Sequence, residues 1–199
     1  MTTVWNVRAV AEHATSHPPL RPLPPEAVRL LDEVGAPPRL VAHLRAVHDV
    51  AAQLVDRLAR SCPRLPVDRE AVLFGAATHD IGKALHPGEL SGPGALHEEA
   101  GRELLLARGV PPERARFAAT HASWAAPGVT VDDLLVSLAD KVWKNKRATD
   151  LEDLVVAELA RAGGRPVWQE FLDLDEFLTA VGEGADLRLA WQATHPVRG

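Results

Sequence analysis

The sequence contains a single cysteine and no tyrosine, and aromatic residues make up only 5% of its 199 positions. Because Cys62 has no second cysteine to pair with, an internal disulfide is excluded, and nothing requires an oxidising compartment. Long apolar runs are also missing. No stretch approaches the ~18 residues of a membrane-spanning helix, and the N-terminus lacks the apolar core of a signal peptide. We therefore expect a cytoplasmic protein without a membrane partner.

An excess of positive charge is missing as well. The formal net charge is −5, which argues against an extended nucleic-acid surface as the main binding partner. The chain does contain nine histidines, a composition that weakly favours metal chemistry. Its length is sufficient for one domain with a substantial core.

Alternating strand patterns are absent from the sequence, and helical periodicity dominates from Glu26 onward. The fold class is therefore predicted to be all-α. Proline, glycine and capping residues place the expected helices at 37–60, from a cap at Asp68 to about 80, 95–108, about 110–121, 130–146, 149–163, 166–181 and 185–193.

Two residues of the ligand type, His79 and Asp80, lie where one of these helices gives way to Gly82. Adjacent side chains can converge at the last turn of a helix, and an imidazole beside a carboxylate suits Mn, Fe, Zn or Mg. Taken alone, such a pair more often marks a helix end followed by a turn aspartate. Its context therefore decides the interpretation.

Two further candidates come from neighbouring helices. His43 lies at the edge of an apolar stripe that continues at spacings of four, eight and eleven residues. His48, three residues after Arg45, is the alternative first ligand. Asp140 is flanked by apolar residues in SLADKV, and a buried carboxylate needs a partner, which a metal would supply.

These residues resemble the H…HD…D order of the HD-domain superfamily of metal-dependent phosphohydrolases. The stretches HLRAVHDVA, AATHDIGK and SLADKV are similar to the family's first-histidine, HD and last-aspartate helices. The resemblance covers roughly residues 26–148. It implies an HD-domain helical bundle in which His43, His79, Asp80 and Asp140 bind a divalent transition metal.

Three parts are expected in the chain. Residues 1–25 are expected to form an N-terminal Pro-rich connector segment, and residues 26–148 the HD domain. Residues 149–199 are expected to form extra C-terminal helices packed on the HD core. The prolines of TSHPPLRPLPPE, at 14–25, exclude one continuous helix through the connector.

His97 and His121 lie in the intervals where two-metal members of the superfamily carry additional ligands. In that arrangement Asp80 bridges two ions, and the imidazoles favour Mn, Fe, Co or Ni, with Mg possible for a single ion. Alternatively, His97 is a first-turn polar residue and His121 a helix cap. Two-metal members often carry a His-His pair where this chain has His121-Ala122. The pattern also resembles small HD hydrolases of dinucleoside polyphosphates.

Three basic residues are candidates for substrate contacts. Lys83 follows Asp80 by three residues, so it can neutralise a phosphate oxygen, although it can equally cap the preceding helix. If the helix of Asp140 continues, Lys144 and Arg147 share its face and are expected to bind substrate. Solvated helix-end charge is the alternative for both.

The function implied by the resemblance is hydrolysis of a phosphate ester or anhydride by metal-activated water. The expected substrate is a nucleotide or a similar small phosphorylated metabolite, with Asp80 and Lys83 as catalytic residues. The Gly/Pro-rich stretch 85–95 is expected to be a loop at the site. One alternative function is an iron-dependent oxygenase with the same ligands. Another is a non-catalytic HD module that binds a ligand or regulates.

Overall fold

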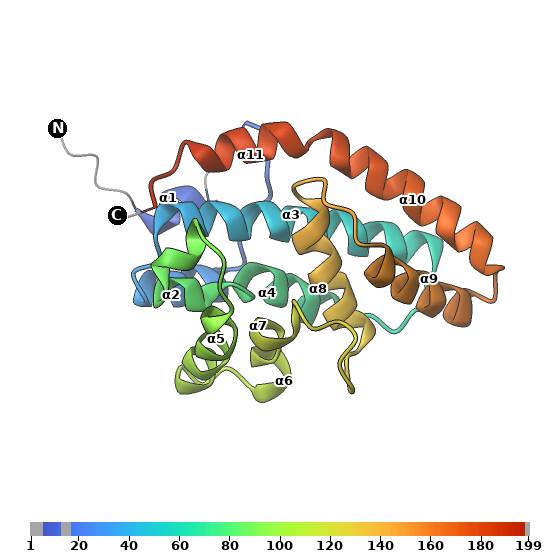
Figure 1. Cartoon of the computed structure of the whole chain (residues 1–199), viewed down its shortest axis with the longest axis horizontal. Helices are drawn as coiled ribbons and strands as arrows, with labels where there is room; N and C mark the ends of the chain where they lie inside the picture. The colour runs from blue at the N-terminus through green and yellow to red at the C-terminus, as the bar shows by residue number, and fades with distance from the viewer. Residues whose placement is uncertain (1–5, 13–16, 198–199) are drawn as a thin grey trace.

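The structure is a computed structural model that describes residues 6–12 and 17–197, and within these ranges it contains no strand (Figure 1). The all-α prediction is confirmed. None of the described helices is long and apolar enough to cross a membrane. The elements are α1 (Val7–Glu12), α2 (Pro25–Glu33), α3 (Pro38–Ser61), α4 (Arg69–Thr78), the 3-10 turns η1 (Ile81–Ala84) and η2 (Pro87–Leu90), α5 (Leu96–Ala107), α6 (Pro112–Ala115), α7 (Phe117–Thr120), α8 (Val131–Val142), α9 (Thr149–Gly163), α10 (Val167–Glu183) and α11 (Ala185–Ala193).

Helix α3 is the central element of the fold, with α11 along one side and α4 along the other (Figure 1). One apolar cluster joins the N-terminal half of α3 to α2, α4 and α5. A second joins its C-terminal half to α4, α8, α9 and α10. The central helix is therefore buried on most sides, and polar residues on it need partners within the protein.

The predicted helix boundaries are largely confirmed by capping contacts. Asp68 caps α4 by accepting a hydrogen bond from the backbone N–H of Ala71 at 3.0 Å. At the start of α8, Asp133 accepts from the backbone N–H of Thr130 at 3.0 Å, as in a capping box. Helix α9 ends at Gly163, and the following Gly164 has a φ of 71°, a left-handed conformation that favours glycine.

Two predicted helices differ from the structure. The single helix expected over 110–121 forms as two short helices, α6 and α7, that are separated at Arg116, whose side chain donates to the Glu113 carbonyl. The helix expected to reach 146 ends at Val142. Asn145 then adopts a φ of 56°, which turns the chain away from the helix axis.

Part of the expected N-terminal connector is ordered against α3. It forms helix α1 and buries Val10 and Leu20. Arg45, fully buried on α3, donates to the Val10 carbonyl at 2.8 Å and to the Leu20 carbonyl at 2.6 Å. Residues 1–5 and 13–16 of the connector lie outside the described residues. Arg45 therefore holds the N-terminal segment on the central helix.

Candidate metal centre

The His79-Asp80 pair lies at the end of α4, where the helix gives way to η1. His79 still has helical backbone angles, whereas Asp80 has a φ of −102° and a ψ of 12°. This change of backbone conformation turns the two adjacent side chains toward one point, with 3.6 Å between His79 Nε2 and Asp80 Oδ2. His79 is fully buried and Asp80 is 2% exposed. Two polar side chains at such depth require internal partners.

Gly82 brings helix α5 against this turn. A Cβ atom at position 82 would lie 2.0 Å from the backbone oxygen of His97 and 2.6 Å from the backbone nitrogen of Gly101. The approach is reciprocal, because a Cβ at Gly101 would lie 3.1 Å from the Gly82 nitrogen. The two glycines thus allow backbone-to-backbone contact, and this contact carries His97 to the site.

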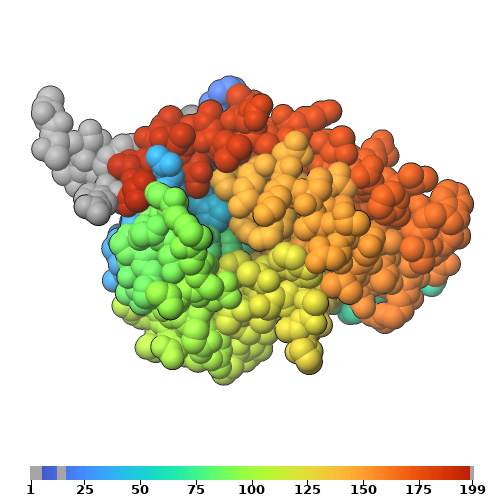
Figure 2. All heavy atoms as spheres, viewed as in Figure 1, coloured from blue at the N-terminus to red at the C-terminus, as the bar shows by residue number. Residues whose placement is uncertain are grey.

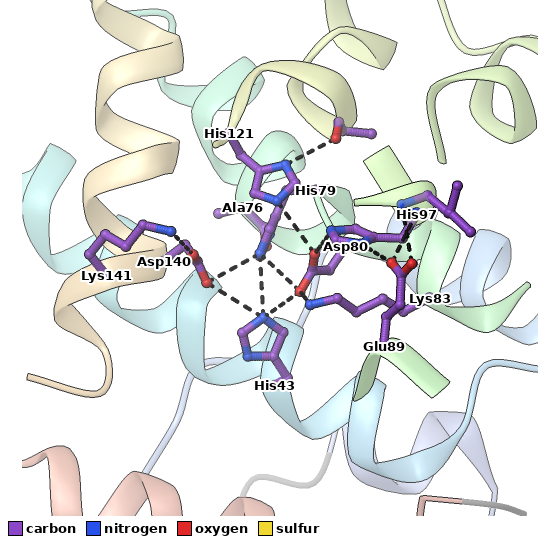
Figure 3. Close-up of polar contacts among 12 residues, drawn as sticks. His43, Ala76, His79, Asp80, Lys83, Glu89, His97, His121, Asp140 and Lys141 are labelled. Carbon is purple, nitrogen blue, oxygen red and sulfur yellow. Dashed lines mark hydrogen bonds and ion pairs between the residues drawn. The ribbon is translucent and has the colours of Figure 1, made fainter. Parts of the chain in front are cut away.

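The first group of side chains gathers around Asp80 Oδ2 (Figure 3). His43 Nε2, from α3, lies 3.0 Å from this oxygen and 3.4 Å from His79 Nε2. Asp140 Oδ1, from α8, lies 3.7 Å from His43 Nε2 and 3.6 Å from His79 Nε2. The structure therefore brings together all four residues of the H…HD…D pattern.

The second group gathers around the other oxygen of the same carboxylate. His97 Nε2 lies 3.0 Å from Asp80 Oδ1, and His121 Nε2 lies 3.5 Å from it. Asp80, His97 and His121 are all buried. In Figure 3 the Asp80 carboxylate stands between the two groups, with one oxygen turned to each. This is the arrangement expected of a bridging carboxylate.

Two of the imidazoles are oriented by backbone carbonyls on their far side. His79 Nδ1 lies 3.0 Å from the carbonyl of Ala76, and His121 Nδ1 lies 3.0 Å from that of Ala118. A carbonyl can only accept, so each Nδ1 carries the proton and each Nε2 presents a lone pair to the Asp80 carboxylate. A ring nitrogen held in this way is a competent metal ligand.

His97 is held by Glu89, a residue in η2 that the sequence analysis did not identify. Glu89 Oε2 lies 2.5 Å from His97 Nδ1 and accepts from the His97 backbone N–H at 3.1 Å. Its Oε1 accepts from the Leu96 backbone N–H at 3.1 Å. Glu89 thus caps α5 and orients its first histidine at once. The acid lies eight residues before the histidine in a loop, a spacing that carries no helical or strand signal.

Two facing atoms of the second group lack a hydrogen-bond partner. These are Asp80 Oδ1 and His97 Nε2, both buried. When His97 Nδ1 donates its proton to Glu89, both facing atoms are acceptors, so the 3.0 Å between them is not a hydrogen bond. A cation satisfies both atoms together. The donor set of imidazoles and carboxylates therefore fits divalent transition metals.

The pKa values of both carboxylates are low. Burial alone would raise the pKa of Asp80, but the surrounding imidazoles of His79, His43 and His97 outweigh it and hold that pKa well below its usual range. The pKa of Asp140 is also held well below its usual range, because the neighbouring imidazoles of His79 and His43 outweigh the effect of burial. Both side chains are thus available as anionic ligands.

The pKa values of the imidazoles are shifted in different directions. Burial lowers the pKa of His43, and it lowers the pKa of His121 to about 4. Burial acts on His97 in the same direction, but the carboxylates of Asp80 and Glu89 outweigh it and raise the pKa of His97. A metal ion binds the neutral ring, so any proton on His97 must leave when an ion binds.

The two nearby lysines both contact the carboxylates. Lys83 Nζ lies 2.6 Å from Asp80 Oδ2, and Lys141 Nζ lies 2.8 Å from Asp140 Oδ2. The side chain of Lys83 is 19% exposed, so the ammonium sits at the boundary between the buried carboxylate and solvent. Lys83, expected to meet a phosphate oxygen, is thus at the edge of the centre, where it pairs with Asp80.

Lys144 and Arg147 have different positions from those expected. Because α8 ends at Val142, neither shares a helical face with Asp140. Lys144 lines a pocket beside His43 and Lys83. Arg147 instead pairs with Glu152 at 2.6 Å and with Asp175 at 2.7 Å, and among the described contacts it has none with the centre. Arg147 therefore joins α9 and α10 to the turn after α8.

His48, the alternative first ligand, lies outside both groups. It is 5% exposed, its Nδ1 has no hydrogen-bond partner, and burial lowers its pKa to about 4. Arg45, which precedes it by three residues, is occupied with the N-terminal segment. Of the two histidines, the structure brings His43 to the cluster.

The family model described as the HD domain matches residues 40–158. No curated protein and no solved structure matches the chain. The matched region covers more than half of the 199 residues and contains every member of the two histidine–aspartate groups. HD domains bind divalent metals, which agrees with the donor set described above. The chain therefore belongs to the HD domain family.

Proposed function

We propose that this protein is a metal-dependent phosphohydrolase. Its substrate is a nucleotide or a similar small phosphorylated metabolite, cleaved at a phosphate ester or anhydride. One observation carries the proposal: the two oxygens of Asp80 each face a separate group of imidazoles, at 3.0 Å from His43 on one side and 3.0 Å from His97 on the other. A shared carboxylate between two nitrogen-rich groups is the arrangement of a two-ion hydrolytic site.

In this proposal each group holds one ion. His43, His79, Asp80 and Asp140 would hold the first, and Asp80, His97 and His121 the second. When bound, such ions acidify water and stabilise the charge that develops on phosphoryl oxygens. The imidazole-rich second group favours Mn, Fe, Co or Ni over Mg, which prefers oxygen ligands.

Lys83 is the residue proposed to contact the phosphoryl group. Its ammonium is flexible, partly exposed and adjacent to Asp80 Oδ2, so it can turn from this carboxylate to a phosphate oxygen at the same edge. Positive charge there stabilises the negative charge on the phosphoryl oxygens in the transition state. Asp80 and Lys83 are therefore the residues on which turnover depends most.

The experiment is a hydrolysis screen. Protein purified without chelators is assayed against nucleotides and phosphorylated metabolites with added Mn, Co, Fe, Ni or Mg. Asp80→Ala should abolish metal binding and turnover while the helical circular-dichroism signal is retained. Full activity of Asp80→Ala would contradict the proposal. Oxygen consumption by an iron-loaded protein without phosphate release would favour an oxygenase instead.

The number of ions is tested by elemental analysis. We expect two ions per chain, and His97→Ala and His121→Ala should each lose about one of them and most of the activity. The loss should appear mainly in kcat, because charge stabilisation is greatest in the transition state. One ion per chain, unchanged in both variants, would assign these histidines to structure or substrate positioning.

A further inference from the structure

An open pocket of about 260 Å³ adjoins the first ligand group. Figure 2 shows a hollow on this face, bordered by the green loop before α5, the orange turn after α8 and the red helix α11. His43 and Lys83 connect the pocket to the metal centre. Leu189 and Gln192 belong to α11 and lie outside the matched HD region, residues 40–158. The lining residues are His43, Lys83, Leu90, Trp143, Lys144, Leu189 and Gln192.

Helix α11 is tied at both ends to the elements that carry the centre. Arg188, 5% exposed, donates through Nε to the carbonyl of Trp143 at 2.7 Å, in the turn that follows α8. At the other end, Arg39 of α3 donates to the carbonyl of His195 at 2.6 Å and to that of Ala193 at 3.1 Å. These contacts therefore fix the position of α11 relative to α3, which carries His43, and to the turn after α8, which carries Asp140.

Besides the buried indole N–H of Trp143, two polar side chains of the pocket, Lys144 and Gln192, lack strong partners within the described part of the chain. Lys144 lies with its ammonium 5.6 Å from the ring centre of Trp143 and has no carboxylate in contact, in contrast to Lys83 and Lys141. The amide of Gln192 makes no hydrogen bond with the described residues. A free cation and a free amide beside a metal centre are groups through which a pocket orients a ligand.

The size and lining of the pocket restrict that ligand. A volume of about 260 Å³ lies below the ~300–1,000 Å³ typical of pockets for drug-sized ligands. Leu90 and Leu189 provide apolar surface, and the pocket contains no carboxylate that would recognise a cationic group. A compact body without charge, attached to an anionic phosphate, matches both properties.

We propose that α11 forms the specificity wall of the substrate pocket and restricts the substrate to phosphomonoesters of a compact, uncharged alcohol. Lys144 attracts the phosphate dianion, Gln192 hydrogen-bonds the leaving group, and Leu189 covers its apolar face. In the reaction, the oxygen of water bonds to phosphorus and the ester P–O bond breaks. The leaving oxygen takes a proton from the water, which gives inorganic phosphate and an alcohol. This inference rests on the proposed function.

The first test compares leaving-group preference in matched variants. Leu189→Ala and Gln192→Leu are assayed with adenosine 5′-monophosphate, thymidine 5′-monophosphate, ribose 5-phosphate and p-nitrophenyl phosphate. The ratios of kcat/KM among these substrates should change by about 3- to 10-fold, the value of one hydrogen bond or buried side chain. Leu187→Ala is the control, because Leu187 is 51% exposed on the same helix and does not line the pocket. Its ratios should equal those of the wild type.

The second test measures binding without turnover. Calorimetry on the metal-loaded protein gives the affinities for inorganic phosphate and for analogues of the same monophosphates in which a methylene group replaces the ester oxygen, so that they bind but are not hydrolysed. Leu189→Ala and Gln192→Leu should weaken the binding of these analogues while leaving that of inorganic phosphate unchanged. Lys144→Gln should weaken every phosphate compound by a similar factor, and Lys146→Gln, an exposed neighbour, should weaken none.

The outcomes separate this inference from the proposed function. If the protein is an active hydrolase and both α11 variants keep the wild-type ratios of kcat/KM, the proposed role of α11 is wrong and the hydrolase function is unaffected. Preferential hydrolysis of dinucleoside polyphosphates would overturn the size restriction. If the wild type hydrolyses none of these compounds, and its affinity for monophosphates still depends on α11, the role of α11 in binding is supported and the hydrolase function is wrong. If no phosphate compound is bound or hydrolysed, both are overturned.

Discussion

Asp80 is the residue on which the centre depends, because its two oxygens serve two different sets of partners. Oδ2 faces His43 and Lys83, and Oδ1 faces His97 and His121. The adjacent imidazoles keep the carboxylate ionised in spite of nearly complete burial. An isolated buried charge of this kind would be strongly destabilising, so its neighbours are a condition for the fold as well as for the chemistry.

Glu89 holds His97 through Nδ1 and caps α5 at the same time, so it is a positioning residue. Glu89→Gln should weaken binding of the second ion by about 10- to 100-fold, as expected for a group that orients a metal ligand. The measurement is competition with a calibrated chelator. Glu99→Gln is the control, because Glu99 is exposed on α5, and this variant should bind both ions as the wild type does.

Equal loss of both ions in Glu89→Gln would contradict this role, because only the second group contains His97.

The ligand-type residues themselves were predictable, since histidines and aspartates in a recognisable order are visible in the sequence. Glu89 was not. A carboxylate reaches a histidine eight residues away only because η2 folds the loop back onto the start of α5, and no periodic spacing records such a contact.

Among the elements, the contact between η1 and α5 decides whether the second group forms. Both backbones approach at Gly82 and Gly101, and a side chain at either position would separate them. The His79-Asp80 pair ends one element and His97 begins the other. Displacement of α5 would therefore move His97 while His43, on α3, stays in place.

Gly82→Ala should destabilise the fold by about 1–3 kcal/mol, as expected for overpacking, because the added Cβ meets backbone at 2.0 Å. It should also lose the second ion before the first. Denaturant unfolding and elemental analysis measure the two effects. Gly88→Ala is the matched control, because a Cβ there meets nothing within 4 Å. Wild-type stability and metal content in Gly82→Ala would show that the contact has no such role.

The boundaries of elements were less predictable than their existence. The capping residues Asp68 and Thr130 marked two helix starts correctly. The predicted end of α8 was wrong, because Asn145 takes a left-handed conformation that the pattern of charges in DKVWKNKR does not indicate. That ending separates Lys144 from Arg147: one lines the pocket, and the other pairs with Glu152 and Asp175.

For the whole molecule, the candidate ligands come from α3, the end of α4, α5, the end of α7 and α8. Ions bound there would link five segments that are distant in sequence. Because a ligand that binds only the folded state stabilises it, ions at 100 times their Kd would contribute about 2.7 kcal/mol each. Folding and metal binding would thus be coupled across the domain.

Removal of the metal should therefore lower the melting temperature. For a chain of this length, the loss of two ions at about 2.7 kcal/mol each, or about 5.4 kcal/mol together, corresponds to a shift of roughly 10–20 °C. Differential scanning calorimetry with and without a chelator measures the shift, and readdition of Mn should restore it. Asp80→Ala should melt at the same temperature in both conditions. A wild-type melting temperature that does not respond to the chelator would contradict the coupling.

The sequence by itself determined the all-α class, most helix starts and the identity of the candidate ligands, because helical periodicity, caps and ligand chemistry are local properties. The spacing of the apolar stripe favoured His43 over His48, and the structure brings His43 to Asp80. The tertiary structure alone decided that Glu89 holds His97 and that α11 lines the pocket. These are contacts between surfaces of packed helices. Their relative rotation and approach depend on the whole core, including two glycines that permit backbones to touch.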